Sequence, residues 1–136
     1  AGLIWPHELA AGEIQHALIV GYSQIRTGGP LTPATASDGQ VAGRGAIPMG
    51  ARIQLDPRID LSTLGLAPYE YAIARALQVY GAFVGDTAGG VCLRFINPYS
   101  FAGNPYQGFL PAEAVTEGGF FWSRFAARDF RILSSP

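Results

Sequence analysis

The sequence contains no lysine, a single cysteine and few charges. Its nine basic residues are all arginine, so the chain has no lysine for a Schiff base or a phosphate contact. Charged residues make up 14% of the chain and the formal net charge is −1, which gives no electrostatic case for binding nucleic acid or an anionic membrane. Because Cys92 is the only cysteine, no intrachain disulfide can form, and its strand-like surroundings favour a small buried residue.

Long apolar runs and the common catalytic fingerprints are also missing. No apolar run approaches the roughly 18 residues of a membrane-spanning helix, and no membrane span is expected. Gly-x-Ser-x-Gly, the Walker loop, the dinucleotide fingerprint and His-Glu-x-x-His do not occur. No cofactor or metal is predicted, and the sequence leaves open whether the protein is an enzyme.

The start of the chain reads AGLIWPHEL, with no initiator methionine and no basic leader. This is not a signal peptide, and we expect a fragment or mature product of a longer precursor. The 136 residues, 49% of them hydrophobic, fit a single domain over 1–136 with a core of its own.

One helix dominates the pattern of apolar residues. Between Pro68 and Tyr80 they recur at the spacing of a helix with one buried face, and Gly81 stands where such a helix ends. The runs 82–85 and 91–96 flank a Gly-rich turn, which predicts a β-hairpin. Further strands are expected at 51–55 and 130–133, and short helices at 6–12 and 120–128. We predict a β-rich α+β fold: a mainly antiparallel sheet or sandwich with the 68–80 helix packed on it.

The segment from Glu13 to Tyr22 carries the candidate chemistry. It is compatible with helix or strand, and the glycines around it favour a strand. On a helix, Glu13 and His16 would share a face as metal ligands do; on a strand they would lie on opposite faces. His16 is either a hydrogen-bonded core histidine or a general base or ligand contact at a cleft. We take His16 and Glu13 as the candidate catalytic residues and predict no metal site.

Aromatic side chains after the hairpin offer a surface for sugar rings. Tyr99 and Tyr106 stand in a Gly- and Pro-rich loop, and Trp122 follows it. These three are the candidate ligand-binding residues, because sugar rings stack on aromatic faces; the alternative is a flap covering the edge of the sheet. The segment 27–47 is the poorest in regular structure, and the sequence assigns it no role.

Three stretches of the chain also resemble a known group of proteins: AGLIWPHELAAGEIQHAL, IPMGARIQLDPRIDLSTLGL and AIARALQVYGAFVGDTAGG. They are similar to the C-terminal part of large, secreted, mostly uncharacterised bacterial proteins, especially actinobacterial ones. The resemblance implies an extracellular or cell-surface location and a carbohydrate setting, and it makes Glu13, His16, Tyr80 and Asp86 the motif positions. Because those proteins usually have a further upstream segment, contact with such a segment is also implied.

These observations lead to two functional hypotheses. The first is an extracellular bacterial module that binds or acts on a polysaccharide or other glycan. The second is a structural or self-associating cell-surface protein without catalysis, whose apolar start and aromatic loops contact neighbouring chains.

Overall fold

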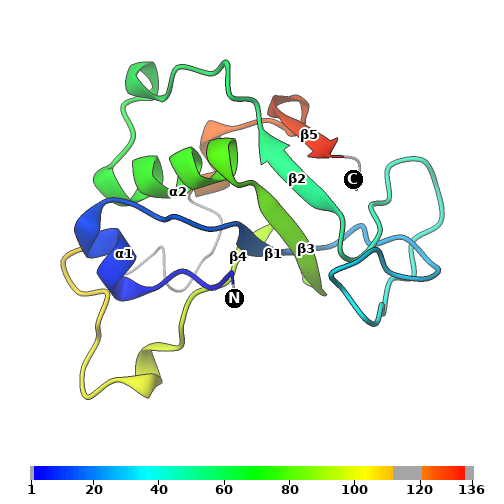
Figure 1. Cartoon of the computed structure of the whole chain (residues 1–136), viewed down its shortest axis with the longest axis horizontal. Helices are drawn as coiled ribbons and strands as arrows, with labels where there is room; N and C mark the ends of the chain where they lie inside the picture. Colours follow the sequence, from blue (N-terminus) through cyan, green and yellow to red (C-terminus); the bar gives the residue numbers. More distant parts are fainter. Residues whose placement is uncertain (1, 112–120, 134–136) are drawn as a thin grey trace.

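The structure is a computed structural model that describes residues 2–111 and 121–133, without the side chain of Phe121. Its strands belong to one five-stranded sheet in the order β4-β1-β3-β2-β5 (Figure 1). The two α-helices are α1 (Pro6–Ala11) and α2 (Pro68–Val79). The strands are β1 (Leu18–Tyr22), β2 (Arg52–Leu55), β3 (Ala82–Thr87), β4 (Cys92–Leu93) and β5 (Phe130–Leu133), and short 3-10 helices are η1 (Leu61–Leu64), η2 (Pro98–Ser100), η3 (Phe121–Arg124) and η4 (Ala127–Asp129).

The predicted β-rich α+β class is confirmed, with one main helix on a sheet. Of the four strand pairings, β1 with β4, β2 with β3 and β2 with β5 are antiparallel, and only β1 with β3 is parallel. The sequence allowed either a sheet or a sandwich, and the described strands form a single sheet. No described helix is long and apolar enough to cross a membrane.

The predicted hairpin after the main helix is wrong. Strands β3 and β4 are consecutive in the chain, but β1 lies between them, parallel to β3 and antiparallel to β4. A turn rich in glycine therefore connects two strands that do not pair. Local turn chemistry predicted the bend correctly, whereas the long-range pairing with the apolar residues of β1 decided the partners.

Helix α2 forms where the sequence predicts it. Pro68 occupies the first turn and a carboxylate oxygen of Glu70 accepts a hydrogen bond from Ala67 N at 2.8 Å, which satisfies a backbone donor at the start of the helix. The helix ends before Gly81, whose φ of 73° lies in the left-handed region. A Cβ there would stand 2.4 Å from the carbonyl oxygen of Ile53, so both the conformation and the close approach require glycine.

The two faces of the sheet have different surroundings. Leu18 and Ala82 pair across β1 and β3 and belong to one buried core with Ile73 and Leu77 of α2. This is the core face. Because side chains alternate along a strand, Ile19 of β1 points to the other face, which we call the open face.

Two segments depart from regular structure. Residues 13–17 lead irregularly into β1, so the predicted strand is confirmed only from Leu18 onward. The long segment between β1 and β2 lies at one end of the molecule (Figure 1) and contains no helix and only isolated bridges. Backbone hydrogen bonds hold it in place, among them Arg26 N to Ile47 O at 2.9 Å and Gly50 N to Val84 O at 2.7 Å.

Candidate functional site

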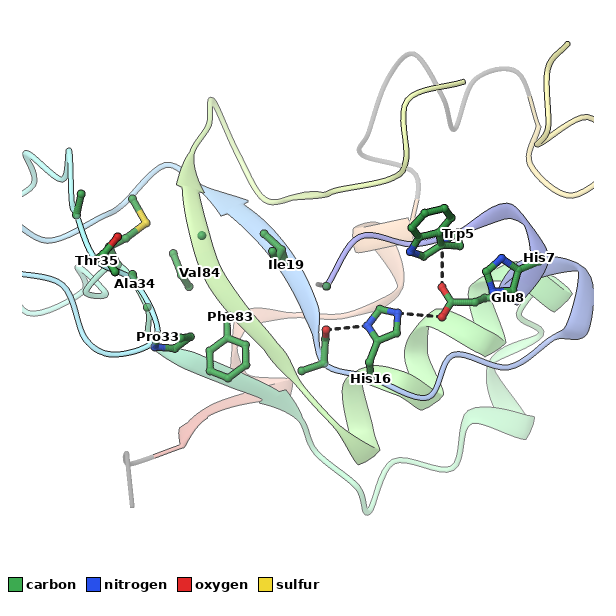
Figure 2. Close-up of a pocket in the computed structure, with 16 residues that line it drawn as sticks. Trp5, His7, Glu8, His16, Ile19, Pro33, Ala34, Thr35, Phe83 and Val84 are labelled. Atoms are coloured by element: carbon green, nitrogen blue, oxygen red, sulfur yellow. Dashed lines mark hydrogen bonds and ion pairs between the residues drawn. The ribbon is translucent and has the colours of Figure 1, made fainter. Parts of the chain in front are cut away.

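A groove of about 840 Å³ crosses the open face of the sheet. Ile19 and Phe83, partners in the parallel β1–β3 pair, lie along its floor. Figure 2 shows Trp5, Glu8 and His16 at one end of this groove and the loop with Pro33 at the other. The remaining lining residues are mostly small or apolar: Gly2, Ala17, Ala34, Ala36, Met49, Gly50, Val84 and Gly85, together with His7 and Thr35. Its volume is in the range typical of ligand sites, roughly 300–1,000 Å³.

Helix α1 positions the polar end of the groove. Pro6 fits the first helical turn, where its missing N–H costs nothing. The helix stops at Gly12, whose φ is 71°, and the left-handed residue turns the chain back toward the sheet. Leu9 and Ile14, on either side of that turn, are buried in the core. This reversal brings His16 back alongside the first turn of α1.

The carboxylate of Glu8 contacts both the backbone of Trp5 and the imidazole of His16. One oxygen of Glu8, Oε2, accepts a hydrogen bond from the backbone N–H of Trp5 at 2.9 Å. The other, Oε1, lies 2.9 Å from Nε2 of His16. Glu8 thereby fixes both neighbours (Figure 2). The side chains of Glu8 and His16 are 13% and 32% exposed, and that of Trp5 is exposed at 43%.

Both ring nitrogens of His16 face oxygen atoms at the groove. Nδ1 of His16 lies 2.9 Å from the carbonyl oxygen of Ala17, and a carbonyl oxygen only accepts, so Nδ1 carries a hydrogen. Nε2 faces the carboxylate of Glu8 at the same distance. The imidazole and the carboxylate therefore offer a ligand polar contacts beside an apolar floor.

The structure separates the residues that the sequence selected. His16 lines the groove, whereas Glu13 is exposed on the connection between α1 and β1, and no hydrogen bond or ion pair joins these two described residues. Tyr99 of η2 is 94% exposed and lies outside the groove. Trp122 of η3 lies over the opposite face of the sheet. The motif positions Tyr80 and Asp86 do not line the groove either.

Tyr106 is a core residue in this structure. It is 2% exposed, its ring packs edge-on against Phe95 with 5.8 Å between centroids, and its hydroxyl donates to the carbonyl oxygen of Ile96 at 2.6 Å. Burial raises the pKa of this hydroxyl. Tyr106 is therefore not available for stacking on a ligand; it anchors the loop that carries it.

Sequence reasoning missed Glu8, Trp5 and Phe83 as members of one site. Glu8 is the third residue of α1, and a carboxylate at this position caps the start of the helix. That role uses only one of its two oxygens. A left-handed turn at Gly12, with seven residues between the partners, was the available indication that Glu8 and His16 meet. No pattern in the sequence indicated Phe83, because its place on the groove floor depends on β1 pairing beside it.

Comparison of the chain with protein-family models, with curated proteins and with solved structures found no match. Within the described residues, no three His, Cys, Asp or Glu side chains gather into a group that could hold a metal ion. The groove geometry therefore carries the functional argument.

Proposed function

We propose that the groove on the open face binds a polysaccharide chain outside the cell. The observation that carries this proposal is the Trp5–Glu8–His16 arrangement at the end of the groove. An exposed indole offers an apolar face to a sugar ring, while a carboxylate and an imidazole beside it supply hydrogen-bond partners for hydroxyl groups. The extracellular setting rests on the resemblance described above.

Binding fits the groove better than two-carboxylate hydrolysis. Glycoside hydrolases of the common types use a pair of carboxyl groups on either side of the scissile bond. Glu8 is the one carboxylate among the described residues that line the groove. Among the described residues, no second carboxylate faces the Glu8–His16 pair across the floor.

The proposal is tested by calorimetric titration of soluble oligosaccharides from plant, fungal and bacterial glycans. For the glycan that binds, Trp5→Ala should weaken binding about tenfold or more, since stacked aromatic anchors dominate such sites. His16→Gln should weaken it less and leave the stacking surface intact. Tyr99→Ala is the matched control, because it removes an exposed aromatic ring outside the groove.

Three results would count against the groove. Failure to bind any glycan and to release any reducing sugar removes the proposal altogether. Loss of binding in Tyr99→Ala with none in Trp5→Ala moves the site to the aromatic loop. Concentration-dependent dimerisation in sedimentation, abolished by Trp5→Ala and with no glycan bound, identifies the groove as a self-association surface instead.

A further inference from the structure

The core face of the sheet holds a second cavity, of about 530 Å³. No residue of α2 lines it, so it lies beyond the part of this face that the helix covers. Val20, Val84 and Ile53 from three neighbouring strands contribute to it. Opposite them stand Trp122 and Phe125, on the segment that begins with η3. The other lining residues are Tyr22, Arg44, Gly45, Ala46, Ile47, Val91, Ala126, Ala127, Phe130, Arg131 and Ile132.

Aromatic contacts shape the wall opposite the strands. The ring of Phe130 on β5 lies 5.7 Å from that of Trp122 and 6.3 Å from that of Phe125. Phe130 and Ile132 pair with Leu55 and Ile53 of β2, which places both on the core face. The cavity therefore lies between apolar strand residues and an aromatic wall of Trp122 and Phe125, and this wall packs against Phe130 of β5.

The charges at this cavity have one sign. Arg44 and Arg131 are the charged residues that line it, and no described aspartate or glutamate does. The guanidinium of Arg131 donates two hydrogen bonds to Oε1 of Gln54, at 2.9 and 2.6 Å. Arg44 is exposed, and no hydrogen bond or ion pair joins its side chain to the described part of the chain. Arg44 is the cation at this cavity with all its donors available.

We propose that the second cavity binds a small amphipathic carboxylate, with its hydrocarbon chain between the strands and the Trp122 wall and its carboxylate on Arg44. The volume suits a small molecule, and the apolar lining favours a hydrocarbon chain. A guanidinium pairs with a carboxylate through two parallel hydrogen bonds. The cavity lies on the core face and the groove on the open face, so the two are separate sites; Val84 is the one described residue that borders both.

Tryptophan fluorescence tests this proposal, because Trp5 and Trp122 are the two tryptophans of the chain. In Trp5→Phe the indole of Trp122 reports alone. Titration of that variant with hexanoate, octanoate and decanoate, below their micelle-forming concentrations, should give saturable changes. Affinity should rise about fourfold for each added methylene, the increment expected for burying a CH₂ group. Decanol should bind more weakly than decanoate, and decyltrimethylammonium should not bind.

Substitutions then locate the head group and the chain. In the Trp5→Phe background, Arg44→Gln should weaken decanoate binding about three- to tenfold and leave decanol unchanged. Arg128→Gln is the control, since it removes the same charge from an exposed residue that does not line the cavity. Ala126→Leu, which adds volume inside the cavity, should reduce binding of both ligands.

Several outcomes would overturn the proposal. It fails if Trp122 shows no saturable response, if the cationic ligand binds as well as decanoate, or if Arg44→Gln behaves like Arg128→Gln. Circular dichroism shows whether Ala126→Leu is folded. If that variant is unfolded, the comparison of Arg44→Gln with Arg128→Gln decides alone.

Discussion

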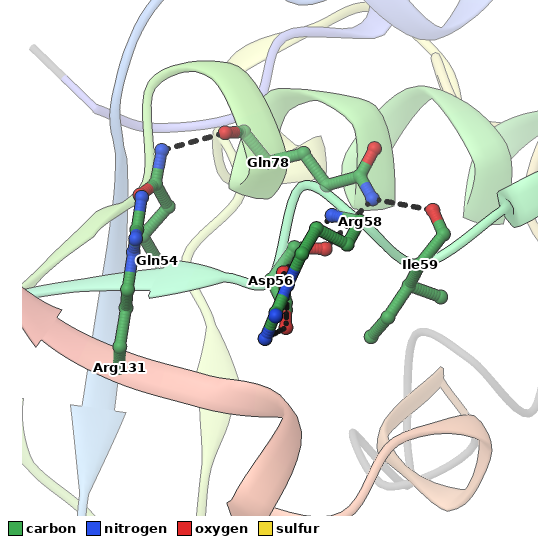
Figure 3. Close-up of polar contacts among 6 residues, drawn as sticks. All are labelled: Gln54, Asp56, Arg58, Ile59, Gln78 and Arg131. Carbon is green, nitrogen blue, oxygen red and sulfur yellow. Dashed lines mark hydrogen bonds and ion pairs between the residues drawn. The ribbon is translucent and has the colours of Figure 1, made fainter.

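Hydrogen bonds from the side-chain amide of Gln78 hold the connection between β2 and α2 against the helix. Gln78 is buried on α2, and its Nε2 donates to the carbonyl oxygens of Asp56 at 3.0 Å and Ile59 at 2.8 Å (Figure 3). Its own backbone oxygen accepts from Nε2 of Gln54 at 2.7 Å. The side-chain amide of Gln78 thereby holds the chain where it leaves β2, and the side-chain amide of Gln54 links the end of α2 to the sheet.

Gln78→Met should destabilise the fold measurably without collapsing it. Methionine keeps the length of the side chain and removes both donated hydrogen bonds, each of which contributes about 0.5–1.5 kcal/mol net. The expected loss is therefore about 1–3 kcal/mol, equivalent to a fall in Tm of roughly 3–10 °C for a chain of this size. Asp56 and Ile59 are only partly buried residues, so water can replace part of the loss, which favours the lower half of this range.

Thermal and urea unfolding followed by circular dichroism measure this loss. Gln107→Met serves as control, because Gln107 is exposed and its substitution should change stability by less than about 0.5 kcal/mol. Gln78→Glu sharpens the test, since a carboxylate cannot donate to the two carbonyl oxygens and should cost more than Gln78→Met near neutral pH. A loss in Gln78→Met no larger than in Gln107→Met would refute the reasoning, and so would a stable Gln78→Glu.

Three further predictions follow from individual residues. Gly81→Ala should cost about 1–3 kcal/mol in chemical denaturation, because alanine would need a left-handed φ against the carbonyl oxygen of Ile53; unchanged stability would contradict the backbone geometry. Tyr106→Phe should cost about 1 kcal/mol in the same measurement, since Ile96 loses a hydrogen-bond donor, and an unaffected variant would argue against the buried hydroxyl. The hydrogen bond from Arg58 lowers the pKa of Asp56 to about 2, below the unfolded value. The stabilisation from this pair is therefore present above about pH 4 and is lost as the pH falls toward 2. The difference in stability between the protein and Asp56→Asn should shrink over that interval, and a constant difference would count against the pair.

Much of the fold follows from local pattern. The helix over 68–80 was predictable because Tyr69, Ile73 and Leu77 repeat at helical spacing and proline and glycine mark its two ends. Strand β2 was predictable because polar and apolar residues alternate along it, as in a half-buried strand. The position of β1 was not predictable in this way, because pairing between distant strands depends on which apolar faces meet and not on the turn beside them.

The candidate site followed from the sequence only in part. His16 was identifiable as a histidine among apolar residues, and it does line the groove. Its partner was expected at Glu13, three residues away, because helical spacing is the pattern a sequence displays most clearly. The actual neighbour is Glu8, brought close by the end of α1 and the turn at Gly12. The aromatic residues expected at a ligand are dispersed between the surface, the core and the opposite face.

Both proposed sites depend on the register of one strand pair. Ile19 and Phe83 lie on the groove floor, and the next residues along the strands, Val20 and Val84, contribute to the second cavity. A slip of one residue in β1 would exchange these faces, bringing Ile19 into the core and exposing Val20. The central place of β1 opposes such a slip, because β4 pairs with it on one side while β3 pairs on the other. The strand to which the sequence assigned no partners is thus the one on which the groove and the cavity jointly depend.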